Sequence, residues 1–327
     1  MRMLNAYIYT NGRLEVLAPA EPISKAAWID ILRPTPPQEA AVRALGVDVP
    51  SLAEMEEIEI SNRLYHEGDA DYLTVVLPGH DVQLHEKSDG QMMGPVCFIL
   101  RKDSIVTVRH HSPRAFETFP PRADKSSLGC STPDRIFLGL IEEVIGRLAD
   151  HLETAGRGLD DVARAIYNPG PRGHRPKDLE IALGKLGGEG ERLSRVRLAL
   201  LTLGRGLNYV DQSLNHRLSA EGLGLVLKGQ IRDIDALEVH ADFLSSRLAL
   251  ASDATLGTIN LSQNATVRIV SVVAVFFLPP TLIASIYGMN FVYMPELAQS
   301  WGYPVALALM IGSAALTWAV FRWKGWL

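Results

Sequence analysis

Gly288, Met289 and Asn290 separate two long apolar runs near the C-terminus, and their chemical groups could meet a hydrated cation. Asn290 offers the only side-chain oxygen of the three, and its amide accepts hydrogen bonds. Gly288 lets the backbone leave a helix with carbonyl oxygens turned toward an ion, whereas the Met289 thioether suits softer metals. A small, strongly hydrated cation loses its water reluctantly, so such oxygens could bind its water shell. An ordinary helix end and loop is the alternative.

Two uncharged runs, residues 269–287 and 303–321, must position this motif, and each has nineteen residues. At about 1.5 Å per residue each helix would be about 28 Å long, close to the roughly 30 Å hydrocarbon core of a membrane. Pro279 and Pro280 do not exclude the first span, because water and neighbouring helices can satisfy the carbonyl groups that they free. Two buried core helices are the alternative, but two such runs in succession favour membrane spans.

The charges that flank these runs predict their orientation. Arg268 precedes the first run, and Arg322 and Lys324 follow the second. The intervening loop contains Glu296 but no lysine or arginine. By the positive-inside rule, we expect both termini in the cytoplasm and the loop outside, with the protein in the inner membrane. Four aromatic residues suit anchoring at the membrane interface: Tyr303, Trp318, Trp323 and Trp326.

The composition of the chain limits which functions and cellular compartments it suits. The net charge of −5 argues against a nucleic-acid partner, since no dominant basic patch is implied. Cys97 and Cys130 lack metal-ligand spacing, and Cys97 lies in an apolar run, which predicts a buried thiol in a reducing compartment. The N-terminus has no apolar core of signal-peptide length, so we expect the first part of the chain to stay in the cytoplasm.

We expect an α+β cytoplasmic domain followed by helices. Strand signals occur at residues 5–10, 26–32, 71–79 and 95–110, and short helices at 37–46 and 51–59. Residues 132 and 133, Thr-Pro, start a helix whose apolar positions repeat every four residues from Ile136. A second helix is expected from about Lys177 to Leu214, with a possible break at its glycines.

The predicted organisation is a cytoplasmic α/β domain at 1–130, a helical region at 131–230, a stalk helix at 231–268, a first span at 269–287, an external loop at 288–302, a second span at 303–321 and a cytoplasmic tail at 322–327.

One helix from Ile231 to Tyr287 would be about 85 Å long and could carry a conformational change from the cytoplasmic domain to the membrane.

The chain here resembles the CorA family of divalent-cation channels. The likeness rests on "YGMNFVYMPEL" at residues 287–297, the proline-bearing span before it, the span after it and the basic-aromatic end "KGWL".

The resemblance implies a homopentameric funnel whose first spans line a pore for Mg²⁺, often with Co²⁺ or Ni²⁺. Met289 favours the magnesium branch, because a zinc branch carries isoleucine there. Gly288, Met289 and Asn290 would form the selectivity filter, with a ring of amide oxygens. Helical spacing below them gives one candidate pore-lining face: Asn264, Val267, Val270, Ser271, Ala274, Leu278 and Thr281.

The apolar part of this face could gate the pore by dewetting, and packing against the second span is the alternative. Many family members carry methionine where Leu278 stands. The family is inhibited by Mg²⁺ held between subunits by carboxylates. Candidates for that regulatory metal site are Asp81, Asp233 and Asp235, with Asp242 as a further choice, although each could be a solvated surface charge. His110 and His111 lack a third ligand nearby and are expected to be a surface pair.

The expected function is gated influx of Mg²⁺, with Co²⁺ or Ni²⁺ as further cargo. Expected partners are other copies of the chain, membrane lipids and divalent cations, without nucleic acid and without a cofactor beyond the transported ion. The first alternative is a proton-coupled Zn²⁺ transporter of the same superfamily. The second is a membrane-anchored sensor or enzyme, which is disfavoured because residues 1–268 show no nucleophile–base pair, phosphate-binding loop or metal-ligand cluster.

Overall fold

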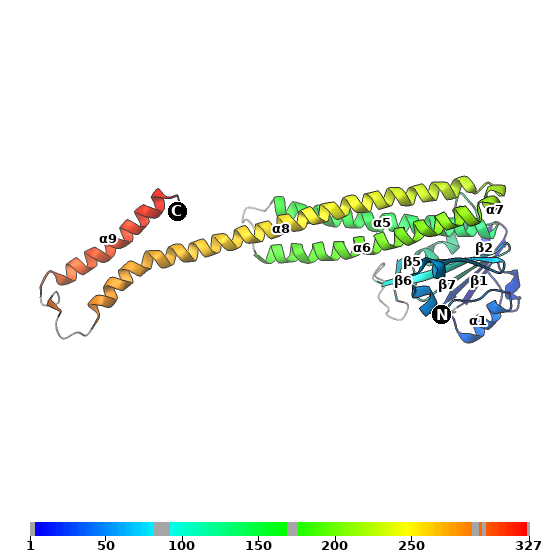
Figure 1. Ribbon diagram of the computed structural model, residues 1–327, viewed down its shortest axis with the longest axis horizontal. Coiled ribbons are helices and arrows are strands. Elements are labelled where there is room, and N and C mark those ends of the chain that lie inside the picture. Colours follow the sequence, from blue (N-terminus) through cyan, green and yellow to red (C-terminus); the bar gives the residue numbers. More distant parts are fainter. Residues whose placement is uncertain (1–3, 82–91, 169–175, 290–293, 296–298, 326–327) are drawn as a thin grey trace. The chain divides into compact units, whose positions relative to one another are not determined.

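The computed structural model describes residues 4–81, 92–168, 176–289, 294–295 and 299–325 of the chain (Figure 1). The chain divides into two compact units, Met1–Asn168 with Ile181–Ser252 and Pro169–Glu180 with Asp253–Leu327. The strands are β1 (Leu4–Thr10), β2 (Arg13–Val16), β3 (Trp28–Leu32), β4 (Leu64–Glu67), β5 (Ala70–Gly79), β6 (Met92–Leu100) and β7 (Ile105–Arg109). The short helices are η1 (Ile23–Lys25), α1 (Pro36–Arg43), α2 (Leu52–Glu56), α3 (Ile60–Arg63), α4 (Ala115–Thr118), η2 (Pro120–Lys125) and α7 (Asn215–Ala220). The long helices are α5 (Pro133–Tyr167), α6 (Pro176–Ser213), α8 (Gly224–Tyr287) and α9 (Gly302–Trp323).

A seven-stranded sheet in the order β2-β1-β3-β7-β6-β5-β4 forms the centre of the first unit. Strands β3 and β7 pair in parallel, and the other neighbours pair antiparallel. Each stretch predicted as strand contains one, and the stretch 95–110 contains two, because residues 101–104 turn the chain between β6 and β7. The prediction omitted the edge strands β2 and β4, which at four residues each are too short to show an alternating pattern.

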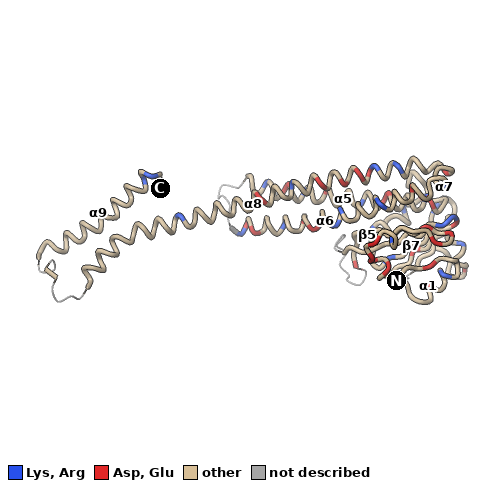
Figure 2. The backbone as a smooth tube through the Cα atoms, in the orientation of Figure 1, with Lys and Arg blue, Asp and Glu red and all other residues tan. Residues whose placement is uncertain are grey.

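Helices α5 and α6 and the first part of α8 pack together within the first unit. Thr132 caps α5 by accepting a hydrogen bond from the Arg135 amide, and the four-residue repeat that begins at Ile136 is buried, as predicted. Helix α6 is continuous, so the break considered at its glycines does not occur. One of them, Gly190, instead permits close packing, since a Cβ there would lie 3.1 Å from the Leu248 side chain of α8. All three helices carry charges of both signs (Figure 2).

Helix α8 contains the predicted stalk and first span without interruption, but it begins at Gly224, before Ile231. Leu227, Ile234 and Ala241 are buried at seven-residue intervals along its first part. This spacing is the one expected where a helix lies in a seam against neighbouring helices. A coupling role for α8 between the two units therefore has a continuous helix to act through.

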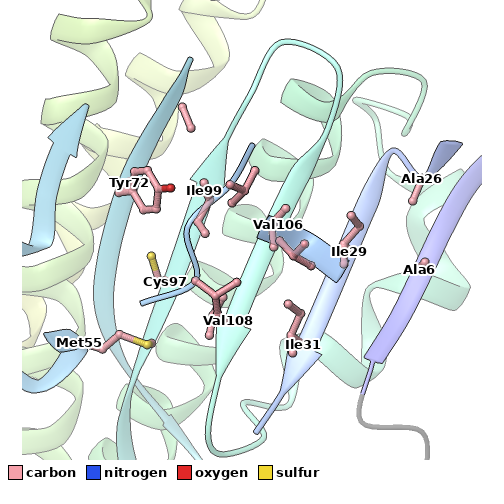
Figure 3. Close-up of a cluster of buried hydrophobic side chains, with 14 of the residues drawn as sticks. Ala6, Ala26, Ile29, Ile31, Met55, Tyr72, Cys97, Ile99, Val106 and Val108 are labelled. Atoms are coloured by element: carbon pink, nitrogen blue, oxygen red, sulfur yellow. The ribbon is translucent and has the colours of Figure 1, made fainter. Parts of the chain in front are cut away.

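The centre of the sheet is buried on both faces. Every residue of β3 and β7 is buried, which matches strands that lie between two covering layers. On one face, Ile29, Ile31, Val106 and Val108 form a cluster with Met55 of α2 (Figure 3). On the other face, the Phe98 ring of β6 packs edge-on against Phe137 of α5, with centroids 5.6 Å apart.

Cys97 is fully buried in the first of these layers, as predicted. Burial raises the pKa of its thiol to about 12, because the apolar surroundings disfavour the thiolate. At neutral pH the side chain therefore behaves as a small apolar group.

The expectation of a surface histidine pair is wrong for His111, which is fully buried. Its Nε2 lies 2.9 Å from the carbonyl oxygen of Leu77. Gly79 and Gly94 make room for the ring, since a Cβ at either position would lie within 2.7 Å of it. Burial lowers the pKa of His111 from its ordinary 6.5 to about 4, because the imidazolium loses its water.

This shift predicts a pH dependence of stability. Below pH 6.5 the unfolded chain binds a proton at His111 that the folded chain does not bind until about pH 4, so acid favours unfolding. We expect His111 to reduce the free energy of unfolding by about 2 kcal/mol between about pH 7 and about pH 5. Hydrogen exchange of the β5 and β6 amides, corrected for intrinsic rates, would measure the effect in the full chain. His111→Gln should remove this component, and an unchanged pH dependence in that variant would contradict the assignment.

Candidate ion-conduction path

The second unit is dominated by the last part of α8 and by α9, both long and apolar enough to cross a membrane. No residue in the most apolar stretch of α8 is buried. That exposure argues against the alternative of a core helix, because a core helix of a water-soluble protein would be covered. Figure 2 shows α9 free of charge until its C-terminal end. Helix α9 begins at Gly302 and ends at Trp323, slightly outside the predicted span.

Pro279 and Pro280 lie inside α8, and the helix continues past them. Proline has no amide hydrogen, so the carbonyl groups of Val275 and Phe276 lose their usual helical donors. In the next turn, the Thr281 hydroxyl donates a hydrogen bond to the Phe277 carbonyl oxygen of the same helix, at 2.7 Å. The span therefore has a polar backbone site within an otherwise apolar stretch.

The glycine-methionine-asparagine motif follows directly on α8. Gly288 still donates its amide to the Ala284 carbonyl oxygen at 2.9 Å, and Met289 donates to Ile286 at 3.2 Å. A Cβ at Gly288 would lie 3.2 Å from the same Ala284 oxygen, so a larger residue would crowd the end of the helix. The Met289 side chain is exposed. Asn290 lies outside the described residues, and its predicted place in the filter remains a prediction.

The seven candidate pore-lining residues lie on α8 at the spacing of one helical face. All seven are exposed: Asn264, Val267, Val270, Ser271, Ala274, Leu278 and Thr281. Other faces of the same stretch are also exposed, as Val273 and Phe277 show. Exposure in one chain therefore does not distinguish a pore-facing side from a lipid-facing side. The assignment of this face to a pore stays a prediction.

Aromatic and basic side chains lie at the ends of the apolar helices. The Arg322 guanidinium stacks over the Trp318 ring, 5.1 Å from its centroid. Trp323 and Tyr303 are among the most exposed aromatic side chains of α9. Such residues are typical of helix ends at a membrane surface. Trp326, also predicted as an anchor, lies outside the described residues, as does Glu296.

The candidate regulatory carboxylates differ in whether another side chain already pairs with them. Asp81 accepts a 2.7 Å hydrogen bond from the Arg33 guanidinium, and Arg33 also donates to the His110 carbonyl oxygen. Arg33 has a φ of 53°, a strained conformation for a side chain of this size, and the two bonds hold it there. Asp81 is thus already paired, which counts against a metal at this carboxylate. The sequence offered no signal for this pair, since the two residues meet only through folding.

Asp233 and Asp235 are exposed on α8, and Asp242 forms an ion pair with Arg197 of α6 at 2.9 Å. Within the part of the chain that the structure describes, no three histidine, cysteine or carboxylate side chains gather as a metal site. A metal held between subunits would take its ligands from two chains. Asp233 and Asp235 therefore stay candidates for such a shared site.

The architecture defines the class of protein: an α/β domain, a long helix that ends in an apolar span, and a second apolar helix. Over 100% of this chain and 99% of the other, the CorA magnesium transporter from Methanocaldococcus jannaschii has the same fold, with a TM-score of 0.74 at 17% identity. The ZntB cytoplasmic domain from Vibrio parahaemolyticus matches 80% of this chain and 99% of its own, with a TM-score of 0.58 at 11% identity.

Sequence similarity identifies the family. The chain belongs to the CorA-like Mg²⁺ transporter protein family, whose pattern it matches over residues 24–323. The magnesium transport protein CorA of Mannheimia succiniciproducens is 33% identical over 328 aligned positions, covering 99% of this chain and 100% of the relative. The resemblance noted in the sequence is confirmed, and so are the α/β domain, the long helix and the second apolar helix.

Proposed function

We propose that this chain transports Mg²⁺ across a membrane. The observation that carries the proposal is full-length similarity to a magnesium transport protein in a chain whose Gly288 and Met289 directly follow an exposed apolar helix. The test is the uptake of Mg²⁺, Co²⁺ and Zn²⁺ by lipid vesicles that contain the purified protein. Mg²⁺ uptake above that of protein-free vesicles supports the proposal, and Zn²⁺ uptake without Mg²⁺ uptake refutes it.

The pore is built from several copies of the chain. Two apolar helices cannot enclose an aqueous path, and the exposed surface of α8 needs other helices or lipid around it. Five copies of α8 would place Leu278 and the rest of the candidate face around one axis. Lipid would then cover the outer helices, and the assembly would reside in the inner membrane. No enzymatic activity and no cofactor beyond the transported ion is part of this proposal.

The ion would cross mostly hydrated. At the outer mouth, Asn290 amides would accept hydrogen bonds from the water shell, without the deep trap that a carboxylate ring would form. Below it, the apolar positions Leu278, Val270 and Val267 would close the path by excluding water. Because α8 is continuous from the first unit into the second, a change in the cytoplasmic domain could shift this closure. Mg²⁺ bound at Asp233 and Asp235 between subunits is the proposed signal.

The zinc alternative rests on one observation, the fold shared with the ZntB cytoplasmic domain. At 11% identity that likeness concerns the fold and carries no information on the ion. Met289 and the 33% identity to a magnesium transport protein favour Mg²⁺.

Orientation gives a separate prediction. A cysteine placed at the exposed Gln299, shortly before α9, should react with a membrane-impermeant thiol reagent on intact cells. A tag at the N-terminus should be protected from the outside, because basic residues flank the cytoplasmic ends of both spans. A cysteine at exposed Lys102 serves as the matched cytoplasmic control. Labelling of the tag but not of position 299 would reverse the topology.

A further inference from the structure

A cavity of about 550 Å³ lies within the first unit, between the α5 helix and the segment formed by η2 and the two serines after it. Two glycines, Gly139 and Gly146, line the α5 side of the cavity. At Gly139 the space is taken by the Phe119 ring, 2.8 Å from where a Cβ would lie. At Gly146 a Cβ would meet no atom within 4 Å, so the space stays open. A volume of this size is typical of sites for small organic ligands.

One wall of the cavity is cationic. Arg122 and Lys125 of η2 line it, followed by Ser126 and Ser127. Among the described residues neither cation forms an ion pair, whereas Arg13 close by is paired with Asp124 at 3.0 Å. Two free cations with adjacent hydroxyl groups are the groups that proteins use to hold phosphate oxygens.

The opposite wall is acidic. Glu142, Glu143 and Asp150 line it from α5, together with Arg147. Arg147 bridges two of these carboxylates, at 3.1 Å from Glu143 and 3.7 Å from Asp150. Glu142 has no hydrogen-bonding or ionic partner among the residues that the structure describes. Carboxylates facing a cavity repel a bare polyphosphate but attract a hard divalent cation or its water shell.

We propose that this cavity binds a polyphosphate group chelated by Mg²⁺, for which Mg²⁺-ATP serves as the probe. The chelate presents phosphate oxygens to Arg122 and Lys125 and its metal to Glu142, so each wall meets its opposite charge. A nucleoside triphosphate with one Mg²⁺ carries about two negative charges, which the two free cations balance. All the residues that line this cavity lie in the first unit. The proposed binding can therefore be tested apart from ion transport, because a binding measurement needs no ion flux.

Isothermal titration calorimetry of the purified full chain in detergent tests the proposal, with four probes. We expect saturable binding of ATP in the presence of Mg²⁺, measured as the heat beyond that of Mg²⁺ alone at the same concentration, and no saturable binding of ATP with a chelator or of an uncharged nucleoside. The double variant Arg122→Ala with Lys125→Ala should weaken Mg²⁺-ATP binding by about tenfold or more, since both phosphate-facing cations are lost.

Gly146 offers a matched pair of variants. Gly146→Met should project a long side chain into the cavity and weaken binding, whereas Gly146→Ala adds a Cβ that meets nothing and should leave binding unchanged. Should Gly146→Met fail to fold, the double variant of the exposed residues Arg122 and Lys125 still tests the proposal. The proposal is overturned if the parental chain shows no saturable binding of Mg²⁺-ATP. It is equally overturned if ATP binds as well with the chelator, or if the double variant binds as tightly as the parent.

Discussion

Asn290→Ala is expected to reduce Mg²⁺ uptake by more than about tenfold while leaving the oligomer intact. Asn290 holds the only side-chain oxygen of the glycine-methionine-asparagine motif, at the mouth of a span whose middle is apolar. A hydrated ion needs hydrogen-bond acceptors there before it meets that apolar section. Every copy in the ring loses its amide at once, so the effect is multiplied by the number of subunits. Folding should survive, because even the loss of a capping asparagine typically costs only about 1 kcal/mol.

Gln299→Ala is the matched control for this variant. It removes an amide from the same loop at an exposed position outside the motif, and its uptake should equal that of the parent. Both variants are compared in vesicles at equal amounts of intact oligomer, checked by size-exclusion chromatography. Parental uptake by Asn290→Ala would mean that the motif is a structural turn, and the proposed path of the ion would be wrong.

Leu278→Ala is expected to have the opposite effect, a pore that leaks Mg²⁺ when it should be closed. Leu278 is exposed on α8 and lies on the candidate pore-lining face, one residue before the two prolines. A ring of smaller side chains widens the apolar section and is easier to wet, so the closed state loses its barrier. We expect basal uptake at high internal Mg²⁺ to rise by about tenfold, while uptake at low internal Mg²⁺ changes little.

Val273→Ala separates a pore effect from a general loosening of the helix. Val273 is exposed on the same apolar stretch and lies about 140° around the helix from Leu278. Val273→Ala removes two methyl groups, whereas Leu278→Ala removes an isopropyl group, and the basal uptake of Val273→Ala should stay at the parental level. If both variants leak equally, the face that carries Leu278 is not the pore lining.

Much of the fold could be predicted because its signals are local. The uncharged runs, the four-residue repeat from Ile136 and the β-branched stretches each show their period within about a dozen residues. The start of α8 at Gly224 could not, because the tertiary packing of Leu227 extends the helix beyond its evident apolar pattern. The burial of His111 also escaped prediction, since it depends on two glycines from β5 and β6 that are distant in sequence.

The candidate site divides in the same way. The motif at Gly288 and Met289 is contiguous and could be recognised from residues alone. The pairing of Asp81 with Arg33 could not, because the two side chains meet only after β3 and β5 enter one sheet. The cavity beside α5 likewise combines residues from two elements, and no spacing along the chain indicates it. Contacts between distant segments, rather than residue types, decide which carboxylates are free to bind an ion.

Mg²⁺ uptake into vesicles of purified protein, under an inside-negative potential and with the proton gradient collapsed, tests the proposed function most directly. Flux through a passive pore is driven by the membrane potential and the Mg²⁺ concentration difference alone. We therefore predict rapid Mg²⁺ accumulation that stops when the potential is removed and the internal Mg²⁺ concentration is no longer below the external one. Protein-free vesicles and vesicles with Asn290→Ala should stay near background. Mg²⁺ uptake that is absent under these conditions and appears only with an imposed proton gradient would contradict a passive Mg²⁺ pore.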